Sequence, residues 1–108
     1  MGDRSHSQLY TELLAFLQQH GLSLESEGFA ETGLHEADLW DFLALLERRS
    51  VPLLGFDVWR RRGSRLAVDH AFAWAAPALS AQENYATARK LLHAAVLHHE
   101  DVVVVQFS

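Results

Sequence analysis

Cysteine is absent from this 108-residue chain, which excludes disulfides and thiolate metal sites. There is also no run of eighteen apolar residues, so the sequence predicts no membrane-spanning helix. The N-terminal residues Met-Gly-Asp-Arg-Ser-His lack the basic and then apolar segments of a signal peptide, and we expect a cytoplasmic protein. We expect one apolar core to hold a single domain over residues 1–108.

Motifs of common enzymes are missing as well. The six glycines are scattered, so the sequence indicates no phosphate-binding loop, and it contains neither Gly-x-Ser-x-Gly nor His-Glu-x-x-His. His93, His98 and His99 are the densest of the seven histidines. On a helix, however, His93 and His98 would point about 140° apart, which does not suit two ligands of one metal ion. We therefore predict no catalytic residue, no metal site and no cofactor.

Basic residues are in the minority, with nine Lys and Arg against fourteen Asp and Glu and a net charge of −5. Nucleic acids bind to basic faces, so this balance argues against them as partners and suits a basic protein instead. A charge of this size also serves solubility alone. The exception is Arg60-Arg61-Arg62 with Arg65, which we interpret as the solvated tip of a hairpin.

Three helices are predicted from apolar residues at helical spacing. The first runs from Ser7 to His20 and the second from about His35 to Arg49; the third follows Pro77, where Ser80 and Glu83 form a capping box. We interpret residues 22–33 as a loop that places Phe29 in the core.

Strands are predicted where the apolar period changes from 3.6 to 2, over residues 53–75 and again over Val102–Phe107. Gly63 supplies a tight connection between the first two strands. The expected fold is α+β with the order α-α-β-β-α-β, a three-stranded, mainly antiparallel sheet and helices packed on one face.

Two aspartates stand out in the hairpin, because a strand pairing that aligns its apolar side chains places Asp57 directly opposite Asp69. Like charges in that arrangement destabilise a sheet. We interpret the pair, beside Trp59, as a surface that awaits cations of a partner, with the tryptophan as an anchor. Three alternatives remain: another register, a bond to Asp57 from a local backbone donor or a neighbouring arginine, or a catalytic dyad, which would need a cleft.

Trp40 is a further interface candidate. It lies a quarter-turn from the apolar stripe of its helix, near Glu36 and Glu47, so we predict a surface aromatic rather than a core one.

The run Val-Pro-Leu-Leu-Gly-Phe-Asp-Val-Trp at 51–59 resembles the immunity protein 40 family of bacterial polymorphic toxin systems. The short hairpin, the aromatic Trp74, Glu83-Asn-Tyr85 at a helix start and the closing strand extend the resemblance over roughly residues 34–108. Family members typically read Val-Pro-Ile-Leu-Gly-Gly-Asp-Val-Tyr, so Phe56 and Trp59 are departures from the pattern.

The resemblance implies an immunity protein, a small antidote that binds one cognate toxin domain and neutralises it by direct contact, without turnover. The toxin-binding candidates are Asp57, Trp59, Asp69, Trp40 and Trp74. The structural candidates are Gly55, Gly63, Ser80, Glu83 and Tyr85. The expected partner is a basic toxin, with no nucleic acid and no membrane. The alternatives are a small adaptor or regulatory binding module and, with less support, a small metal-dependent hydrolase.

Overall fold

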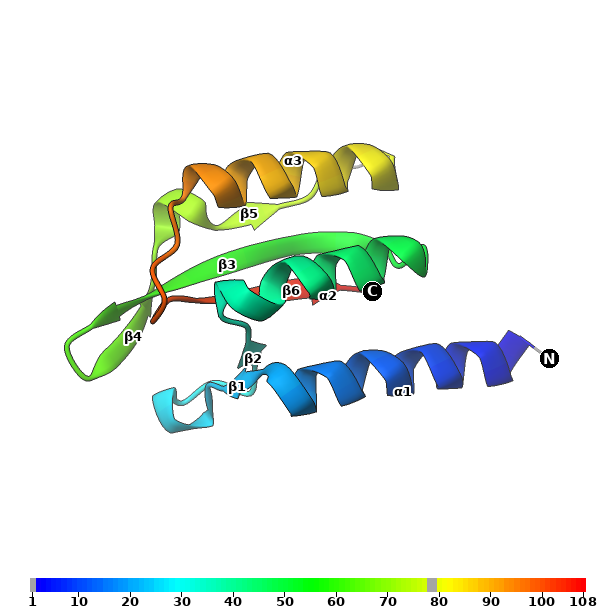
Figure 1. Ribbon diagram of the computed structural model, residues 1–108, viewed down its shortest axis with the longest axis horizontal. Helices are drawn as coiled ribbons and strands as arrows, with labels where there is room; N and C mark the ends of the chain where they lie inside the picture. The colour runs from blue at the N-terminus through cyan, green and yellow to red at the C-terminus, as the bar shows by residue number, and fades with distance from the viewer. Residues whose placement is uncertain (1, 78–79) are drawn as a thin grey trace.

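The computed structural model describes residues 2–77 and 80–108, with side chains from Gln8 onward in these ranges. Its helices are α1 (Gly2–His20), α2 (Glu36–Arg48) and α3 (Ala81–Ala94) (Figure 1). The helix α3 begins where the sequence predicts, because the Ser80 hydroxyl accepts a 3.2 Å hydrogen bond from the backbone N–H of Glu83. The helix α1 is longer than predicted and begins at Gly2.

The long strand β3 (Leu53–Arg62) is the centre of a four-stranded antiparallel sheet. On one edge it pairs with β4 (Arg65–Val68) and then β5 (Trp74–Ala75), and on the other with β6 (Val102–Phe107). A second sheet joins β1 (Leu22–Ser23) to β2 (Thr32–Gly33). The α+β class and the antiparallel pairing are confirmed. The predictions of three strands and of the order α-α-β-β-α-β are wrong, because β1 and β2 lie between α1 and α2 and β5 follows β4. These strands of two residues are too short to show a period in the sequence.

The predicted hairpin register is wrong by one residue. Trp59 lies opposite Val68 and Arg62 opposite Arg65, so only Gly63 and Ser64 form the connection. Gly63 has a φ of 63°, which glycine adopts freely at such a two-residue turn. Because a shift of one residue exchanges the two faces of a strand, each side chain of β4 lies on the face opposite to its prediction relative to β3.

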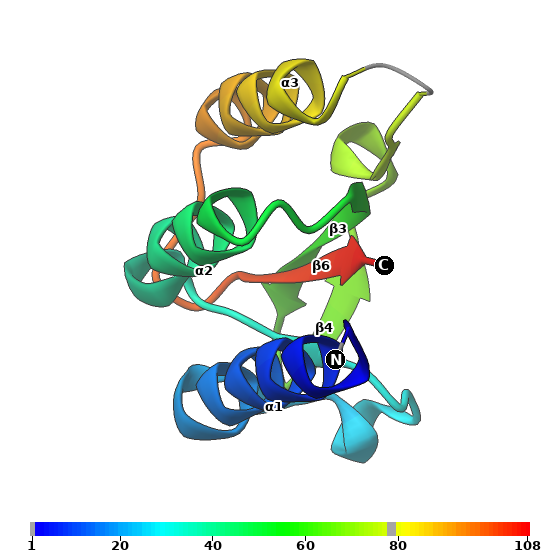
Figure 2. The ribbon, with the colours of Figure 1, turned by 90° about the vertical axis from the view of Figure 1, so that its right-hand side faces the viewer.

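The main core lies between the helices and the inner face of the sheet. Phe56 and Val58 of β3 and Val103 and Val105 of β6 pack there against buried side chains of all three helices. Figure 2 shows α2 and α3 on one side of the sheet, with α1 beside α2 and beyond the β6 edge. The prediction of helices on one face therefore holds for α2 and α3.

A smaller core covers part of the outer face of the sheet. It contains Trp59, Leu66, Val102 and Val104, together with Leu24, which is 0% exposed and precedes the 3₁₀ turn η1 (Glu25–Glu27). The prediction that Phe29 is the core residue of this segment is wrong. Phe29 is 46% exposed. Its ring meets the ring of Trp59 edge to face, with centroids 4.9 Å apart.

Candidate functional site

The five predicted toxin-binding residues do not form one surface. Asp57 points to the outer face of the sheet, where its Oδ2 accepts a 2.8 Å hydrogen bond from Nε2 of Gln106 on β6. Its donor is thus a side chain of the neighbouring strand, neither the local backbone group nor the nearby arginine that the sequence offered as an alternative. The prediction that Asp57 lies across from Asp69 is wrong, because the shift of one residue brings Asp69 to Val58, whose carbonyl accepts a 2.8 Å bond from the backbone N–H of Asp69.

Trp59 is not the exposed anchor that the sequence predicts. Only 4% of the residue is exposed, because Leu24 and Leu66 cover it in the smaller core. Its indole Nε1 has no hydrogen-bond partner among the described residues. A side chain enclosed in this way contributes to stability and offers little area to a partner.

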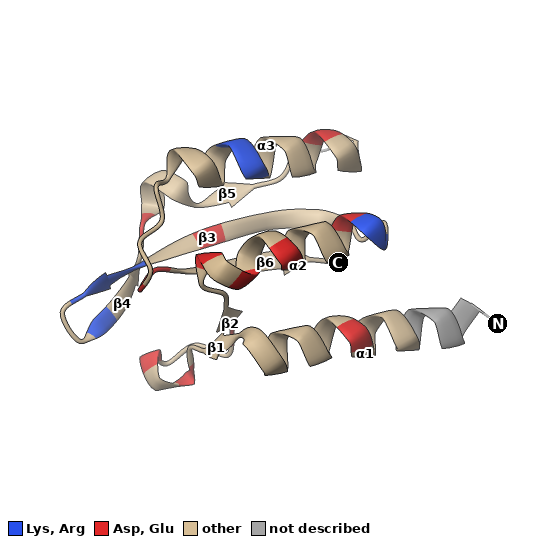
Figure 3. Cartoon of the chain, in the orientation of Figure 1, with Lys and Arg blue, Asp and Glu red and all other residues tan. Residues whose placement is uncertain are grey.

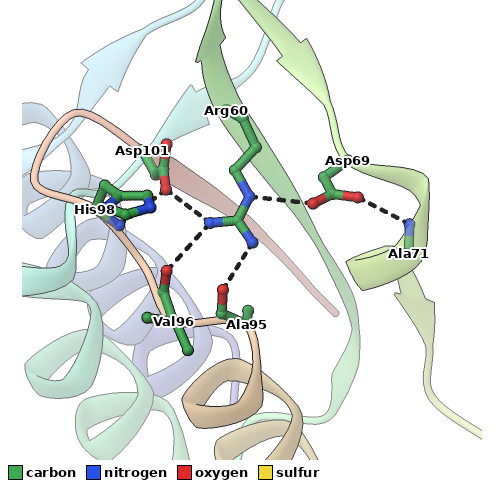
Figure 4. A network of polar contacts seen from close by, with 7 residues as sticks. All are labelled: Arg60, Asp69, Ala71, Ala95, Val96, His98 and Asp101. Atoms are coloured by element: carbon green, nitrogen blue, oxygen red, sulfur yellow. Dashed lines mark hydrogen bonds and ion pairs between the residues drawn. The ribbon is translucent and has the colours of Figure 1, made fainter.

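Asp69 belongs to a network around Arg60 (Figure 4). Its Oδ2 accepts a 3.1 Å bond from Nε of Arg60, and its Oδ1 accepts from the backbone N–H of Ala71, which caps the 3₁₀ turn η2 (His70–Phe72). The bond from Arg60 and then that from Ala71 lower the pKa of Asp69. The free carboxylate that the sequence predicts is thus paired within the fold.

Asp101 is the second acid of this network, and sequence reasoning missed it. It is 4% exposed and accepts 2.8 Å from Nη1 of Arg60 and 2.9 Å from the backbone N–H of His98. Burial raises the pKa of Asp101, but these two bonds outweigh burial and the net pKa is lowered. Arg60 also donates 2.7 Å to the carbonyl of Ala95 at the end of α3. The network therefore joins β3, η2, the end of α3 and the segment before β6.

A signal for this network was present in the sequence. Arg60 continues the alternation of Phe56 and Val58, so it falls on the helix-covered face of β3, where a charge needs partners. Burial lowers the pKa of Arg60, yet bonds to Asp101 and Asp69 outweigh this effect and raise the pKa overall. The side chain of Arg60 is only 16% exposed and is enclosed by its polar partners, so Arg60 does not belong to a solvated hairpin tip.

Trp74 of β5, Gly55 of β3 and Tyr85 of α3 have structural surroundings. The indole of Trp74 is half-buried against Phe56, with ring centroids 5.6 Å apart. A Cβ on Gly55 would overlap the carbonyl oxygen of Trp74, so strand β5 can approach only a glycine there. The buried hydroxyl of Tyr85 donates a 2.6 Å bond to the carbonyl of Val51, and burial raises its pKa to about 12.

Trp40 was predicted to be a surface aromatic rather than a core one; it is half-buried, packs against the main core and also lines an open recess. One face of its indole stacks on His93 of α3, with centroids 4.5 Å apart and planes 14° apart. The recess lies beside the first turns of α2 and is lined by His35, Glu36, Ala37, Trp40 and His99. We call these five residues the Trp40 recess.

A groove also separates α2 from α1. Phe16 and Leu45 contribute apolar surface to the groove, Glu12 and Asp41 contribute carboxylates, and Arg48 contributes a cation. Glu12 is 3.2 Å from Arg49, while the exposed side chain of Asp41 has no ion pair among the described residues. We call the exposed side of α2, from the Trp40 recess to Asp41, the α2 surface.

Charge is divided unevenly along the chain. Residues 5–47 contain no lysine or arginine but eight acids: Glu12, Glu25, Glu27, Glu31, Glu36, Asp38, Asp41 and Glu47. Residues 48–65 contain six arginines and one acid. Figure 3 shows acids on α1, η1 and most of α2, with others on β3 and α3, and basic residues at the hairpin of β3 and β4, at the end of α2 and on α3. The α2 surface is therefore suited to a cationic partner.

Neither metal-binding groups among the described residues nor comparisons with known proteins assign a function to this geometry. The described residues include no group of three or more His, Asp or Glu side chains placed to hold a metal ion. None of the described helices has the length and apolar character needed to span a bilayer. Comparison with protein-family models, curated proteins and solved structures gives no significant match. The family resemblance of residues 34–108 therefore stays a prediction.

Proposed function

We propose that this chain is an immunity protein that binds a basic bacterial toxin and neutralises it by direct contact through the α2 surface. The observation that carries the proposal is Trp40, a half-buried tryptophan beside an open recess in the acidic part of the chain. Tryptophans in such positions are frequent anchors of protein interfaces. Carboxylates around the anchor would steer a basic partner and select against acidic ones.

The resemblance of residues 51–59 to the immunity protein 40 family supplies the toxin as the partner class. The proposed binding residues differ from those that the sequence favoured. Asp57 and Asp69 accept bonds from Gln106 and Arg60, and Trp59 is enclosed, so the proposal transfers recognition to Trp40, Glu36 and Asp41.

The test is a titration of the product of the adjacent gene, which the proposal expects to be the toxin, with the purified protein. An antidote that acts by binding without turnover should abolish toxin activity at about one equivalent, and the two proteins should elute together in size-exclusion chromatography. A general adaptor would bind without abolishing toxin activity. An enzyme would inactivate the toxin at far below one equivalent. Either of these last two results would overturn the proposal.

A further inference from the structure

We propose that the Trp40 recess binds the guanidinium group of one arginine side chain of the partner. This inference rests on the proposed function, because it names the chemistry of a contact on the same surface. The recess has a volume of about 620 Å³ and is open to solvent, which leaves room for a long side chain to enter without rearrangement of the backbone.

The aromatic side chain of the recess is Trp40, and its ring stacks on His93 of α3. His93 covers one face of the Trp40 indole at a nearly parallel 14°, and His93 does not line the recess. Trp40 also packs against the main core, so it lines the recess with the part of the indole that stays exposed. A cation over such a ring is attracted by its π electrons, and the planar guanidinium of arginine can also stack on it.

The acidic component is Glu36, which precedes Trp40 by one helical turn and so lies on the same side of α2. Among the described residues no cation pairs with it. Two basic side chains near α2 have other partners, since Arg89 bonds Glu47 at 2.6 Å and Arg49 bonds Glu12 at 3.2 Å. Arg48 is at the opposite end of α2 from Glu36. Glu36 is thus a carboxylate without a counter-charge, one turn from an aromatic surface.

Arginine fits these two groups better than lysine does. The guanidinium can stack on an indole through its flat face and donate two hydrogen bonds to a carboxylate through its edge. An ammonium group offers a point charge and no planar surface. His35 borders the recess but its Nδ1 is 3.1 Å from the carbonyl oxygen of Asp101, so it is held at the rim.

The probe for the test is the peptide acetyl-Gly-Arg-Gly-amide, followed by the indole N–H signal of Trp40 in NMR spectra of the full chain. The signal is assigned from the Trp40→Leu variant, in which it is missing. We expect a saturable shift with a millimolar dissociation constant. A peptide with citrulline in place of arginine has the same shape without the charge and should cause no shift; the lysine peptide should bind more weakly.

Two variants test the components separately. Glu36→Gln should weaken binding of the arginine peptide roughly three-fold or more, as expected for a partly exposed ion pair. Glu31→Gln removes the same charge from an exposed position outside the recess and should leave binding unchanged. No shift with the arginine peptide, equal shifts with the citrulline or lysine peptide, or equal effects of the two variants would overturn the inference.

The neighbouring toxin then separates this inference from the proposed function. If wild type neutralises the toxin but Trp40→Leu, with an unchanged circular dichroism spectrum, binds it equally well, the recess is not used and the proposed function stands. If the arginine peptide binds but the toxin does not, the proposed function fails and the recess keeps its ligand. If Trp40→Leu binds the toxin about ten-fold or more weakly than wild type, the result supports both the inference and the proposed function.

Discussion

The guanidinium of Arg60 donates a 2.8 Å hydrogen bond to the buried carboxylate of Asp101, forty-one residues later in the chain. This contact joins the end of β3 to the segment that leads into β6. The same guanidinium donates to the carbonyls of Ala95 and Val96, which directly follow α3. Arg60, which the sequence predicts at a solvated hairpin tip, thus connects segments that are far apart in the chain.

Arg60→Ala should therefore destabilise the domain severely, by about 3 kcal/mol, because it leaves the buried Asp101 without its counter-charge. Arg65→Ala is the matched control, since Arg65 is exposed at the hairpin tip. It should change the free energy of unfolding by less than about 0.5 kcal/mol. Urea denaturation of the two variants measures the difference, and equal effects would show that the network does not stabilise the fold.

The same network predicts how stability depends on pH. The pKa values of Asp69 and Asp101 are lowered in the folded state, so their contribution to stability is fully present above the unfolded value of about 3.9. It is lost as the pH falls through the folded pKa values. The stability difference between wild type and Arg60→Ala should be constant from pH 7 to about 5 and shrink below about 4. A difference that stays the same at pH 3 would contradict this explanation.

Trp59→Ala should cost about 3–5 kcal/mol of stability, because it removes the largest side chain of the smaller core. Phe29→Ala, at the exposed side of the same contact, should cost much less. Thermal melts distinguish this outcome from the sequence-based prediction, in which Trp59 is an exposed anchor whose loss leaves stability nearly unchanged.

Tyr85→Phe removes one hydroxyl without leaving a cavity. The carbonyl of Val51 then loses the 2.6 Å bond that it accepts in a buried site. We expect a loss of about 1 kcal/mol in chemical denaturation. An unchanged midpoint would mean that the carbonyl finds another donor.

Periodicity was enough to predict the main elements of the fold. The helix α2 lies within about one residue of its predicted bounds, α3 begins after the predicted Ser80 cap, and β6 occupies Val102–Phe107 as expected, because apolar spacing and the cap act locally. The two-residue strands were not predictable, since a run of two has no period. The hairpin register depended on whether the connection is Gly63-Ser64 or Arg62-Gly63-Ser64, and apolar matching favoured the longer one, which is wrong.

Site residues were harder to predict, because their surroundings come from distant segments. Trp59 is buried by Leu24, thirty-five positions earlier, and Asp69 is paired by Arg60 across the strand pair. Helical geometry did place Trp40 near Glu36, because both belong to one helix. The acidic bias of residues 5–47 is also visible in the sequence, whereas the recess itself depends on His99 of a distant segment.

The central claim is that a basic toxin binds the α2 surface rather than the outer face of the sheet. It is tested most directly by calorimetric titration of the neighbouring gene's toxin with two charge reversals, Asp41→Arg on α2 and Asp57→Arg on β3. The account predicts a loss of affinity of about ten-fold or more for Asp41→Arg and less than about three-fold for Asp57→Arg. Normal binding by Asp41→Arg together with a large loss for Asp57→Arg would place the interface on the sheet and contradict the account.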